Sequence, residues 1–219
     1  MKCKHEFCGM QILLIAATPD EVELFINTYP NVDILITGVG TPATIYHLQK
    51  QLQHKEYDFV VQAGIAGAFS GDFSLGQTVL IKQDTFGDLG AEEKRLFTPF
   101  FTSGLIDAHQ FPFADSWLIN KSEGLLKKSI LRWVKAVTIN KVSDSFLQKL
   151  QLIDAFDPQI ESMEGAALHY VCLQEEIPFV QIRTVSNYVG ERDKSKWKMK
   201  EAIENLNTEL SKLIKQLTS

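Results

Sequence analysis

Short apolar runs alternate along this chain with segments in which apolar residues recur every three or four positions. The runs are nearly continuous stretches of Val, Ile, Leu and Phe, a pattern that is typical of strands covered on both faces. We therefore predict strands at residues 11–16, 32–37, 58–63, 77–81, 135–140 and 179–185. The segments between them predict helices at residues 20–28, 42–54, 116–128, 143–152 and 163–175.

The last segment has the most regular pattern. Its apolar positions are separated by three or four residues, with Lys, Glu and Asn between them: Met199, Ile203, Leu206, Leu210, Leu213 and Leu217. This spacing predicts an amphipathic helix whose apolar face packs on a core. An interaction through its charged face is the alternative, and packing against a sheet explains the apolar stripe better.

This alternation of strands and helices predicts an α/β fold, a three-layer α/β/α sandwich around a central mixed, mostly parallel sheet. Residues 84–114 interrupt the alternation and are rich in Phe, Gly and Asp. A segment of this length without a regular pattern usually carries a function or an interface. The absence of repeats or linkers predicts one domain over residues 10–219, preceded by a disordered tail at residues 1–9.

The composition is that of an ordinary globular protein. The chain has 219 residues, of which 45% are hydrophobic and 22% charged, and a net charge of −5. This charge gives no reason to expect nucleic acid or an anionic membrane as partner. No apolar run approaches the ~20 residues of a membrane span, and the polar start does not resemble a signal peptide. Three cysteines are too few for a disulfide framework and favour a reduced, cytoplasmic protein.

Two short motifs have ready structural explanations. Cys3, His5 and Cys8 lack an obvious fourth metal ligand, so we predict no metal site and read them as part of the tail. Residues 38–43 match the G-x-G-x-x-A dinucleotide fingerprint. The next strand ends without the acidic residue that a Rossmann site needs for the ribose. Pro42 as the first helical residue explains part of the motif structurally.

Two glutamates stand where segments change from strand to helix. Glu21 follows the first strand, where a carboxylate can act as a general base. Glu164 opens a helix, and a carboxylate can accept two hydrogen bonds from a ribose diol. Taken singly, each is better explained as an acid in the first turn of a helix. Residues 64–68 predict a tight turn of small residues that a ligand can approach closely.

The order of these fragments is more specific than any one of them. A-x-x-x-E-V follows the first strand, T-G-V-G the second and V-x-x-G-x-A-G the third, and S-M-E-G-A-A and P-F-V-x-I-R-x-V-S come later. From about Met10 to the last helix, the chain resembles the superfamily of purine nucleoside phosphorylases and methylthioadenosine/S-adenosylhomocysteine nucleosidases. The resemblance implies a single nucleosidase domain that cleaves N-glycosidic bonds without a cofactor, as a homodimer or larger homo-oligomer.

The resemblance also implies roles for individual residues. Glu21 looks like the carboxylate that positions and deprotonates the attacking water, with Gly67 near that water. Glu164 looks like the acceptor for the ribose hydroxyls, and Met163 packs against the sugar. Two further residues, Phe146 and Leu147, look like a base-pocket pair.

The attacking group is predicted to be water. Phosphorylases of this superfamily need arginines and a hydroxyl around the phosphate. The corresponding segments here contain no Arg, and Ile65 stands where a Ser would be expected. A phosphate would then meet Glu21 without a cation to offset the repulsion.

Asn187, with Ser186 beside it, indicates the nature of the base. Adenine-releasing nucleosidases of this superfamily have Asp at this position. The Asn NH₂ can donate to N7 and O6 of a 6-oxopurine, whereas an ionised Asp would place charge against O6. Leaving a buried group unmatched costs roughly 1–3 kcal/mol. Because Asn187 cannot supply a proton, the leaving base must depart as an anion or be protonated by water or another residue.

Residues 186–197, with residues 88–92 and the ESMEGAA string, resemble the branch of the superfamily that acts on futalosine. Futalosine is a hypoxanthine riboside with a carboxyphenyl-ketone chain on its 5′ carbon, and its cleavage belongs to menaquinone biosynthesis. The Phe-rich residues 84–114 are candidates for an apolar slot, and Arg192 or Arg183 for the cation that binds the tail carboxylate. The alternatives are a methylthioadenosine or inosine nucleosidase, or a non-catalytic nucleoside-binding protein.

Overall fold

The computed structural model describes residues 10–26, 29, 32–142 and 145–218. The Cys3, His5 and Cys8 cluster, the predicted tail, and residues 27–28 and 143–144 of two predicted helices lie outside them. The described elements, in chain order, are β1 (Ile12–Ala16), the 3₁₀ turns η1 (Pro19–Glu21) and η2 (Glu23–Phe25), β2 (Val32–Ile36), α1 (Thr41–His54), β3 (Phe59–Ala68), β4 (Thr78–Asp84), β5 (Gly90–Glu93), β6 (Leu96–Pro99), α2 (Phe100–Ser103), β7 (Leu118–Ile119), α3 (Glu123–Leu126), β8 (Trp133–Thr138), α4 (Phe146–Phe156), β9 (Ile160–Ser162), α5 (Gly165–Gln174), β10 (Phe179–Tyr188), η3 (Lys194–Lys196) and α6 (Met199–Thr218).

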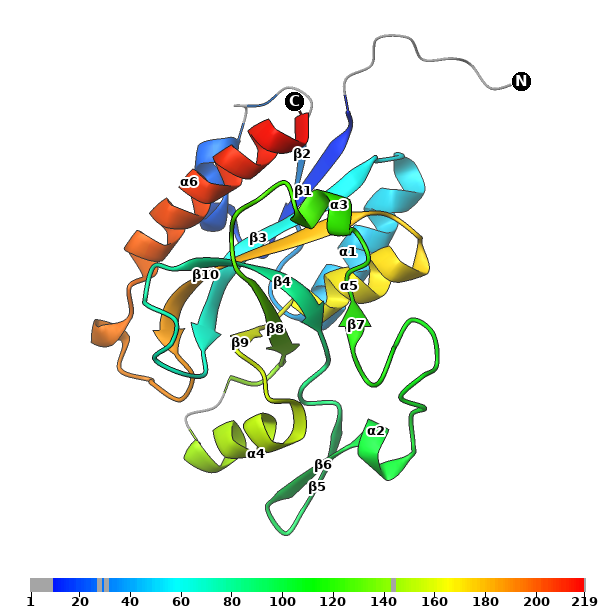
Figure 1. Cartoon of the computed structure of the whole chain (residues 1–219), viewed down its shortest axis with the longest axis vertical. Coiled ribbons are helices and arrows are strands. Elements are labelled where there is room, and N and C mark those ends of the chain that lie inside the picture. Colours follow the sequence, from blue (N-terminus) through cyan, green and yellow to red (C-terminus); the bar gives the residue numbers. More distant parts are fainter. Residues whose placement is uncertain (1–9, 27–28, 30–31, 143–144, 219) are drawn as a thin grey trace.

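One half of the molecule has three layers. Parallel strands β2, β1, β3 and β10 lie side by side, with α6 on one face and α1 and α5 on the other (Figure 1). Ile12 and Leu14 pack with the α6 leucines, whereas Leu13 and Ile15 pack with α1 and α5. The first apolar run is therefore continuous because helices cover both of its faces. The predicted amphipathic helix at the C-terminal end is confirmed.

In the other half, the sheet closes on itself. From β10 it continues through β4, β8 and β9, and β9 then pairs with β3, which also pairs with β10. The β10–β4, β3–β9 and β4–β7 pairings are antiparallel and the others in this sheet parallel. Apolar side chains fill the inside of the ring, among them Phe73, Ile81, Ile160 and Val185. The α/β class and the mixed, mostly parallel sheet are confirmed, but a plain sandwich does not describe this closed half.

Two predicted helices are wrong, and local hydrogen bonds explain why. At residues 20–26, two short 3₁₀ turns replace the helix, because the Glu21 carboxylate accepts the backbone N–H groups of Ala17 and Thr18. At residues 116–128, most of the segment is strand β7 and loop. Asn120 ties this loop to the sheet by donating from Nδ2 to the Phe179 carbonyl, and it accepts the N–H of Ser122. Asn and Ser compete with the helical backbone in this way.

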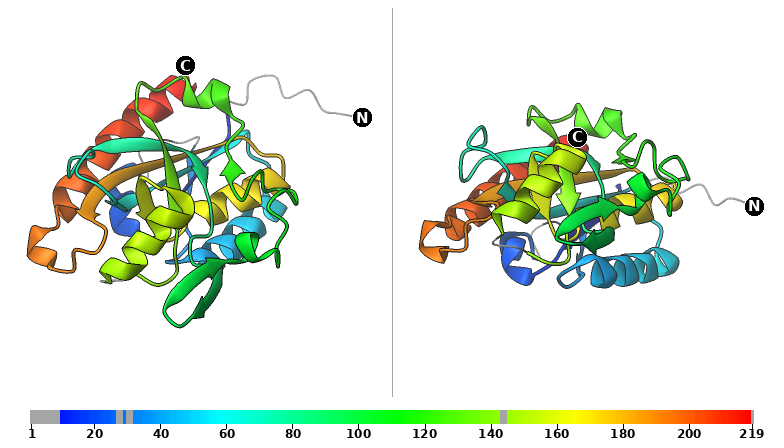
Figure 2. Two further views of the ribbon diagram at one scale, coloured as in Figure 1. Left: turned by 60° about the horizontal axis from the view of Figure 1, so that its bottom comes forward. Right: turned by 90° about the horizontal axis from the view of Figure 1, so that it is seen from below.

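The Phe-rich residues 84–114 form a separate substructure beside the closed half of the sheet, here called the barrel. β5 and β6 make a two-stranded hairpin that leads into α2, and α4 lies against β6 (Figure 2). Three of its rings, Phe86, Phe101 and Phe113, form an aromatic cluster with Tyr170 of α5. Much of the aromatic content therefore attaches the hairpin region to the domain.

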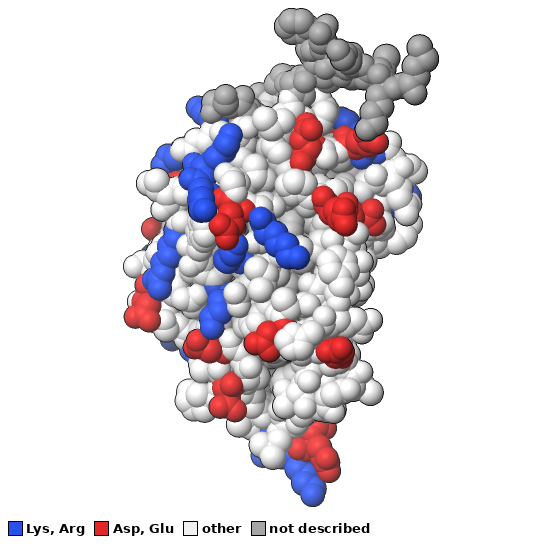
Figure 3. All heavy atoms as spheres, turned by 45° about the vertical axis from the view of Figure 1, so that its right-hand side comes forward, with Lys and Arg blue, Asp and Glu red and all other residues white. Residues whose placement is uncertain are grey.

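The surface agrees with the charge balance of the sequence. On the face drawn in Figure 3, basic and acidic side chains are interspersed and form no large patch of one sign. Among the described helices, none has the length and apolar character that crossing a bilayer requires.

Candidate active site

A cavity of about 370 Å³ opens where β1, β3 and β10 end and where α5 begins. This is the edge of a parallel sheet at which ligands usually bind in α/β folds. Most of the residues singled out in the sequence line it: Glu21, Gly67, Met163, Glu164, Asn187 and Arg192. These residues come from five separate segments, so the fold assembles a site that no single motif contains.

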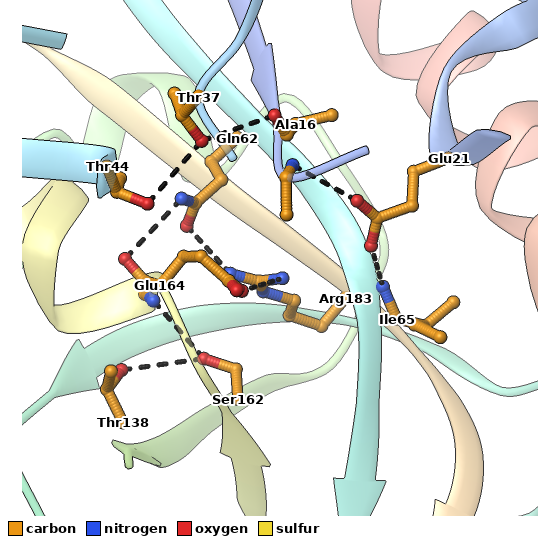
Figure 4. Close-up of polar contacts among 12 residues, drawn as sticks. Ala16, Glu21, Thr37, Thr44, Gln62, Ile65, Thr138, Ser162, Glu164 and Arg183 are labelled. Atoms are coloured by element: carbon orange, nitrogen blue, oxygen red, sulfur yellow. Dashed lines mark hydrogen bonds and ion pairs between the residues drawn. The ribbon is translucent and has the colours of Figure 1, made fainter. Parts of the chain in front are cut away.

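Backbone amides fix Glu21 at the floor of this cavity. Its Oε2 accepts the N–H groups of Ala17 and Thr18 at 3.1 Å, and its Oε1 accepts that of Ile65 at 3.1 Å (Figure 4). The side chain is buried, and burial raises its pKa, against the opposing effects of Arg183 and of these amides. Because burial outweighs these opposing effects, the carboxylate has a raised affinity for a proton, as a general base requires.

Glu164 lies across the cavity, at the start of α5. Its Oε1 accepts the N–H of Gly40 at 3.0 Å. Gly40 has φ +91°, a conformation that strains any residue with a side chain, and it caps α1. Gly40 of the dinucleotide-like motif thus brings its backbone N–H to Glu164. In the described residues, no group of three or more His, Cys, Asp or Glu is arranged to hold a metal ion.

Arg183 is a site residue whose position the sequence prediction missed. The residue is 1% exposed, and its guanidinium lies 3.6 Å from Glu164 Oε2 and donates to Gln62 Oε1 at 2.9 Å (Figure 4). A Cβ on Gly64 would clash with this guanidinium and lie 2.9 Å from Glu21 Oε1. Gly64 therefore leaves room for one buried cation between two glutamates. The signal available in the sequence was an arginine inside an otherwise apolar strand, since a buried charge needs a partner.

Arg183 corrects two predictions. As a cation for the tail of a substrate it is wrong, because it is buried and paired with Glu164. The expectation that no cation stands near Glu21 is also wrong, because Arg183 lowers the pKa of Glu21 against the effect of burial. The one positive charge of Arg183 faces the negative charges of Glu21 and Glu164. Among the described residues around Glu21, no positive charge is therefore left over to bind a phosphate.

Asn187 and Gly67 lie together at the other side of the cavity. Gly67 pairs with Asn187 across β3 and β10, and a Cβ on Gly67 would lie 3.4 Å from Asn187 Nδ2. Ser186 Oγ donates to Asn187 Oδ1 at 2.8 Å, and Asn187 Nδ2 donates to the Tyr188 carbonyl at 3.1 Å. These two bonds fix the orientation of the amide and leave one N–H of its NH₂ group as a donor. Residues 64–68 are wrong as a turn, because β3 continues to Ala68 and pairs with β10.

The remaining predicted residues lie around the entrance. Arg192 borders both this cavity and a neighbouring one of about 650 Å³, and its guanidinium lies 5.5 Å from the centre of the Trp197 ring. Leu147 lines the neighbouring cavity. Phe146 is 71% exposed, and the structure does not bring it to the wall of the main cavity. The base-pocket role of this pair stays a prediction. Phe97 lines a third cavity of about 100 Å³.

Known proteins are similar to this chain in sequence and fold. The family model described as "Phosphorylase superfamily" matches residues 17–219. A futalosine hydrolase of Thermus thermophilus is 29% identical over 184 residues, which cover 82% of this chain and 80% of that protein. A 5'-methylthioadenosine/S-adenosylhomocysteine nucleosidase of Listeria welshimeri is 23% identical over 210 residues, covering 83% and 88%.

A solved structure agrees in fold. The futalosine hydrolase of Helicobacter pylori strain 26695 aligns with a TM-score of 0.78 over 95% of this chain and 98% of that chain, at 14% identity. At this identity the similarity establishes the fold alone. The predicted likeness to nucleoside phosphorylases is confirmed at that level.

Proposed function

The chain belongs to the phosphorylase superfamily, and we propose that it is a hydrolase that cleaves the N-glycosidic bond of futalosine. The products are hypoxanthine and dehypoxanthine futalosine, in menaquinone biosynthesis. One observation carries this proposal: Glu21, Glu164 and Asn187, from distant parts of the chain, line a single cavity. The 29% identity to a futalosine hydrolase supports this substrate over that of the 23% identical nucleosidase.

The two glutamates account for hydrolysis. In its ionised form, Glu21 accepts a proton from a water molecule that attacks C1′ of the ribose. Glu164 accepts hydrogen bonds from the ribose hydroxyls, and Met163 packs on the sugar. The transition state is oxocarbenium-like, and the preorganised carboxylates stabilise its positive charge. Arg183 keeps Glu164 in place, since the side chain is buried against that carboxylate.

Asn187 accounts for the base. Its Oδ1 accepts the Ser186 hydroxyl and one N–H of its NH₂ group donates to the Tyr188 carbonyl, so the second N–H is the donor that meets a ligand. An NH₂ donor matches N7 and O6 of hypoxanthine, which are both acceptors. Adenine presents a 6-amino donor there, and two facing donors leave a buried group unmatched. Arg192, at the entrance, binds the carboxylate of the 5′ tail.

The remaining assignments complete the proposal. We treat residues 10–219 as one nucleosidase domain that needs no cofactor and acts as a homodimer or larger homo-oligomer. The partner is a small-molecule purine nucleoside, not a nucleic acid or a membrane. Three cysteines, of which Cys172 is free and buried, support a cytoplasmic location.

The test is a comparison of three substrates. The purified full chain is incubated separately with futalosine, inosine and methylthioadenosine, and the released base is measured by chromatography. We expect hypoxanthine from futalosine and little release from the other two. Adenine from methylthioadenosine would favour the rival nucleosidase, and release from none of the three would favour a nucleoside-binding protein.

A further inference from the structure

Glu161 occupies a position in the site to which the proposed mechanism gives no role. It is the middle residue of β9 and pairs with Gly67 of β3, which in turn pairs with Asn187 of β10. Register partners on neighbouring strands carry their side chains on the same face. The next partners, Ile160 and Ala68, point into the barrel core. Glu161, Gly67 and Asn187 therefore face the cavity, and all three line it.

Gly67 lies between the two polar residues of this row. The backbones of Glu161 and Asn187 are two strand spacings apart, about 9.5 Å. The Asn187 amide lies over Gly67, since a Cβ there would be 3.4 Å from Asn187 Nδ2 and 3.1 Å from Val189 Cγ2. Glu161 borders the cavity from the strand on the other side of Gly67. A base whose N7 and O6 meet Asn187 thus presents its opposite edge to Glu161.

The surroundings of the Glu161 carboxyl favour its protonated form. It is half-buried, and in the described part of the chain no hydrogen bond or ion pair engages it. The charged groups around it are Arg192, Lys149 and Asp88. Burial, with a smaller contribution from Asp88, raises its pKa to about 7, against the opposing effects of Arg192 and Lys149. Near neutral pH the group is thus divided between its acid and its carboxylate form.

We propose that Glu161 is the general acid that protonates the leaving base. This inference rests on the proposed function and deepens it. As the C1′–N9 bond breaks, its electron pair stays with the base, and the Glu161 carboxyl gives its proton to a ring nitrogen on the edge opposite Asn187. The attacking water gives one proton to Glu21 and its hydroxyl to C1′. Transfer of that proton through solvent from Glu21 to Glu161 restores both groups.

Recognition of the base and its protonation are thus divided between Asn187 and Glu161. An amide has no ionisable proton, so Asn187 recognises the acceptors of the base but cannot protonate it. Glu161 supplies the proton from the strand on the other side of Gly67. A neutral leaving base replaces an anion, which lowers the barrier to bond cleavage.

The test compares pH profiles of kcat for futalosine in the wild type, Glu161→Gln and Glu161→Asp. For the wild type, kcat falls as the pH rises through about 7, because the acid is lost. Glu161→Gln lowers kcat about 10²–10⁴-fold, removes this alkaline limb and changes KM little. Glu161→Asp keeps an alkaline limb at a changed pH, which rescues function in part. The matched control is Glu204→Gln, an exposed glutamate of α6.

The outcomes separate this inference from the proposed function. A Glu161→Gln variant that keeps the alkaline limb, or whose kcat stays within about threefold of the wild type, contradicts the role of Glu161. If that variant fails to fold, the alkaline limb of Glu161→Asp decides, because an unmoved limb contradicts the role equally. If the wild type cleaves inosine or methylthioadenosine instead of futalosine, the proposed function fails, and the same pH comparison on that nucleoside still tests Glu161.

Discussion

The ribose end and the base end of the site are built differently. At the ribose end, Glu21 and Glu164 are buried, accept backbone N–H groups and share the buried Arg183. At the base end, Asn187 and Glu161 are half-buried, and Glu161 also borders the third cavity, which residues of α4 line. The rigid end suits a bond-breaking step that needs fixed charges. At the base end, single substitutions can exchange donors and acceptors without disturbing a buried ion pair.

The largest effect is expected from Glu21→Gln. The amide cannot accept the proton of water, so kcat falls about 10²–10⁴-fold. Because burial raises the pKa of Glu21, wild-type kcat falls as pH is lowered through that raised value, and this limb is missing in the variant. Steady-state kinetics across pH measure both. Glu23→Gln, an exposed position in η2, is the control. Unchanged turnover in Glu21→Gln would contradict the mechanism.

Gly64→Ala tests whether the ribose end tolerates movement. The new Cβ meets the Arg183 guanidinium and the Glu21 carboxylate, and displaced catalytic groups lower kcat about 10²-fold. Overpacking also lowers the free energy of unfolding by about 1–3 kcal/mol, which urea denaturation measures. Gly71→Ala is the matched control, since a Cβ there has no neighbour within 4 Å. Equal behaviour of the two variants would show that the close packing at Gly64 is unimportant.

Asn187→Asp tests the base end. An unmatched buried donor or acceptor costs about 1–3 kcal/mol, so the ratio of kcat/KM for futalosine to that for methylthioadenosine should fall about ten- to hundredfold. The ratio for the wild type, measured in parallel, is the reference. A wild type that already cleaves the adenine nucleoside, with no change on substitution, would remove Asn187 as the determinant of base preference.

The smallest effect is expected from Arg192→Ala. Loss of an exposed cation at the entrance should raise KM for futalosine a few-fold, on the scale of about 1 kcal/mol for an exposed ion pair. KM for inosine, which lacks the tail carboxylate, should stay the same. Lys194→Ala, two residues further along the loop, is the control. Equal changes for both nucleosides would exclude a specific contact with the tail.

Each end of the site contains residues that could be predicted from the sequence and one that could not. Glu21, Glu164 and Asn187 could be found because each follows a strand or opens a helix, where motifs are short and local. Arg183 was placed wrongly, since its partner Glu164 is distant in sequence and only the pairing of β3 and β10 brings them together. Glu161 is part of the ESMEGAA string, but no role was predicted for it, because only the pairing of β9 with β3 places it in the cavity.

The same holds for the fold: elements that depend on one stretch of the chain could be predicted, whereas pairings between distant strands could not. β1 follows from a continuous apolar run and α6 from apolar residues at every third or fourth position, and both patterns lie within one stretch of the chain. The closure of the sheet depends on β9 pairing with both β3 and β8, which no local pattern records. β3 was predicted too short because its last residues, GIAGA, look like a turn until β10 pairs with them.

The central claim is that this chain uses water to release hypoxanthine from futalosine. The most direct measurement follows hypoxanthine and the sugar product by chromatography, with the purified full chain and futalosine, in phosphate-free buffer and in buffer with phosphate. We predict equal rates and free dehypoxanthine futalosine in both. Strict dependence on phosphate with a phosphorylated sugar product, or no hypoxanthine in either buffer, would contradict the account.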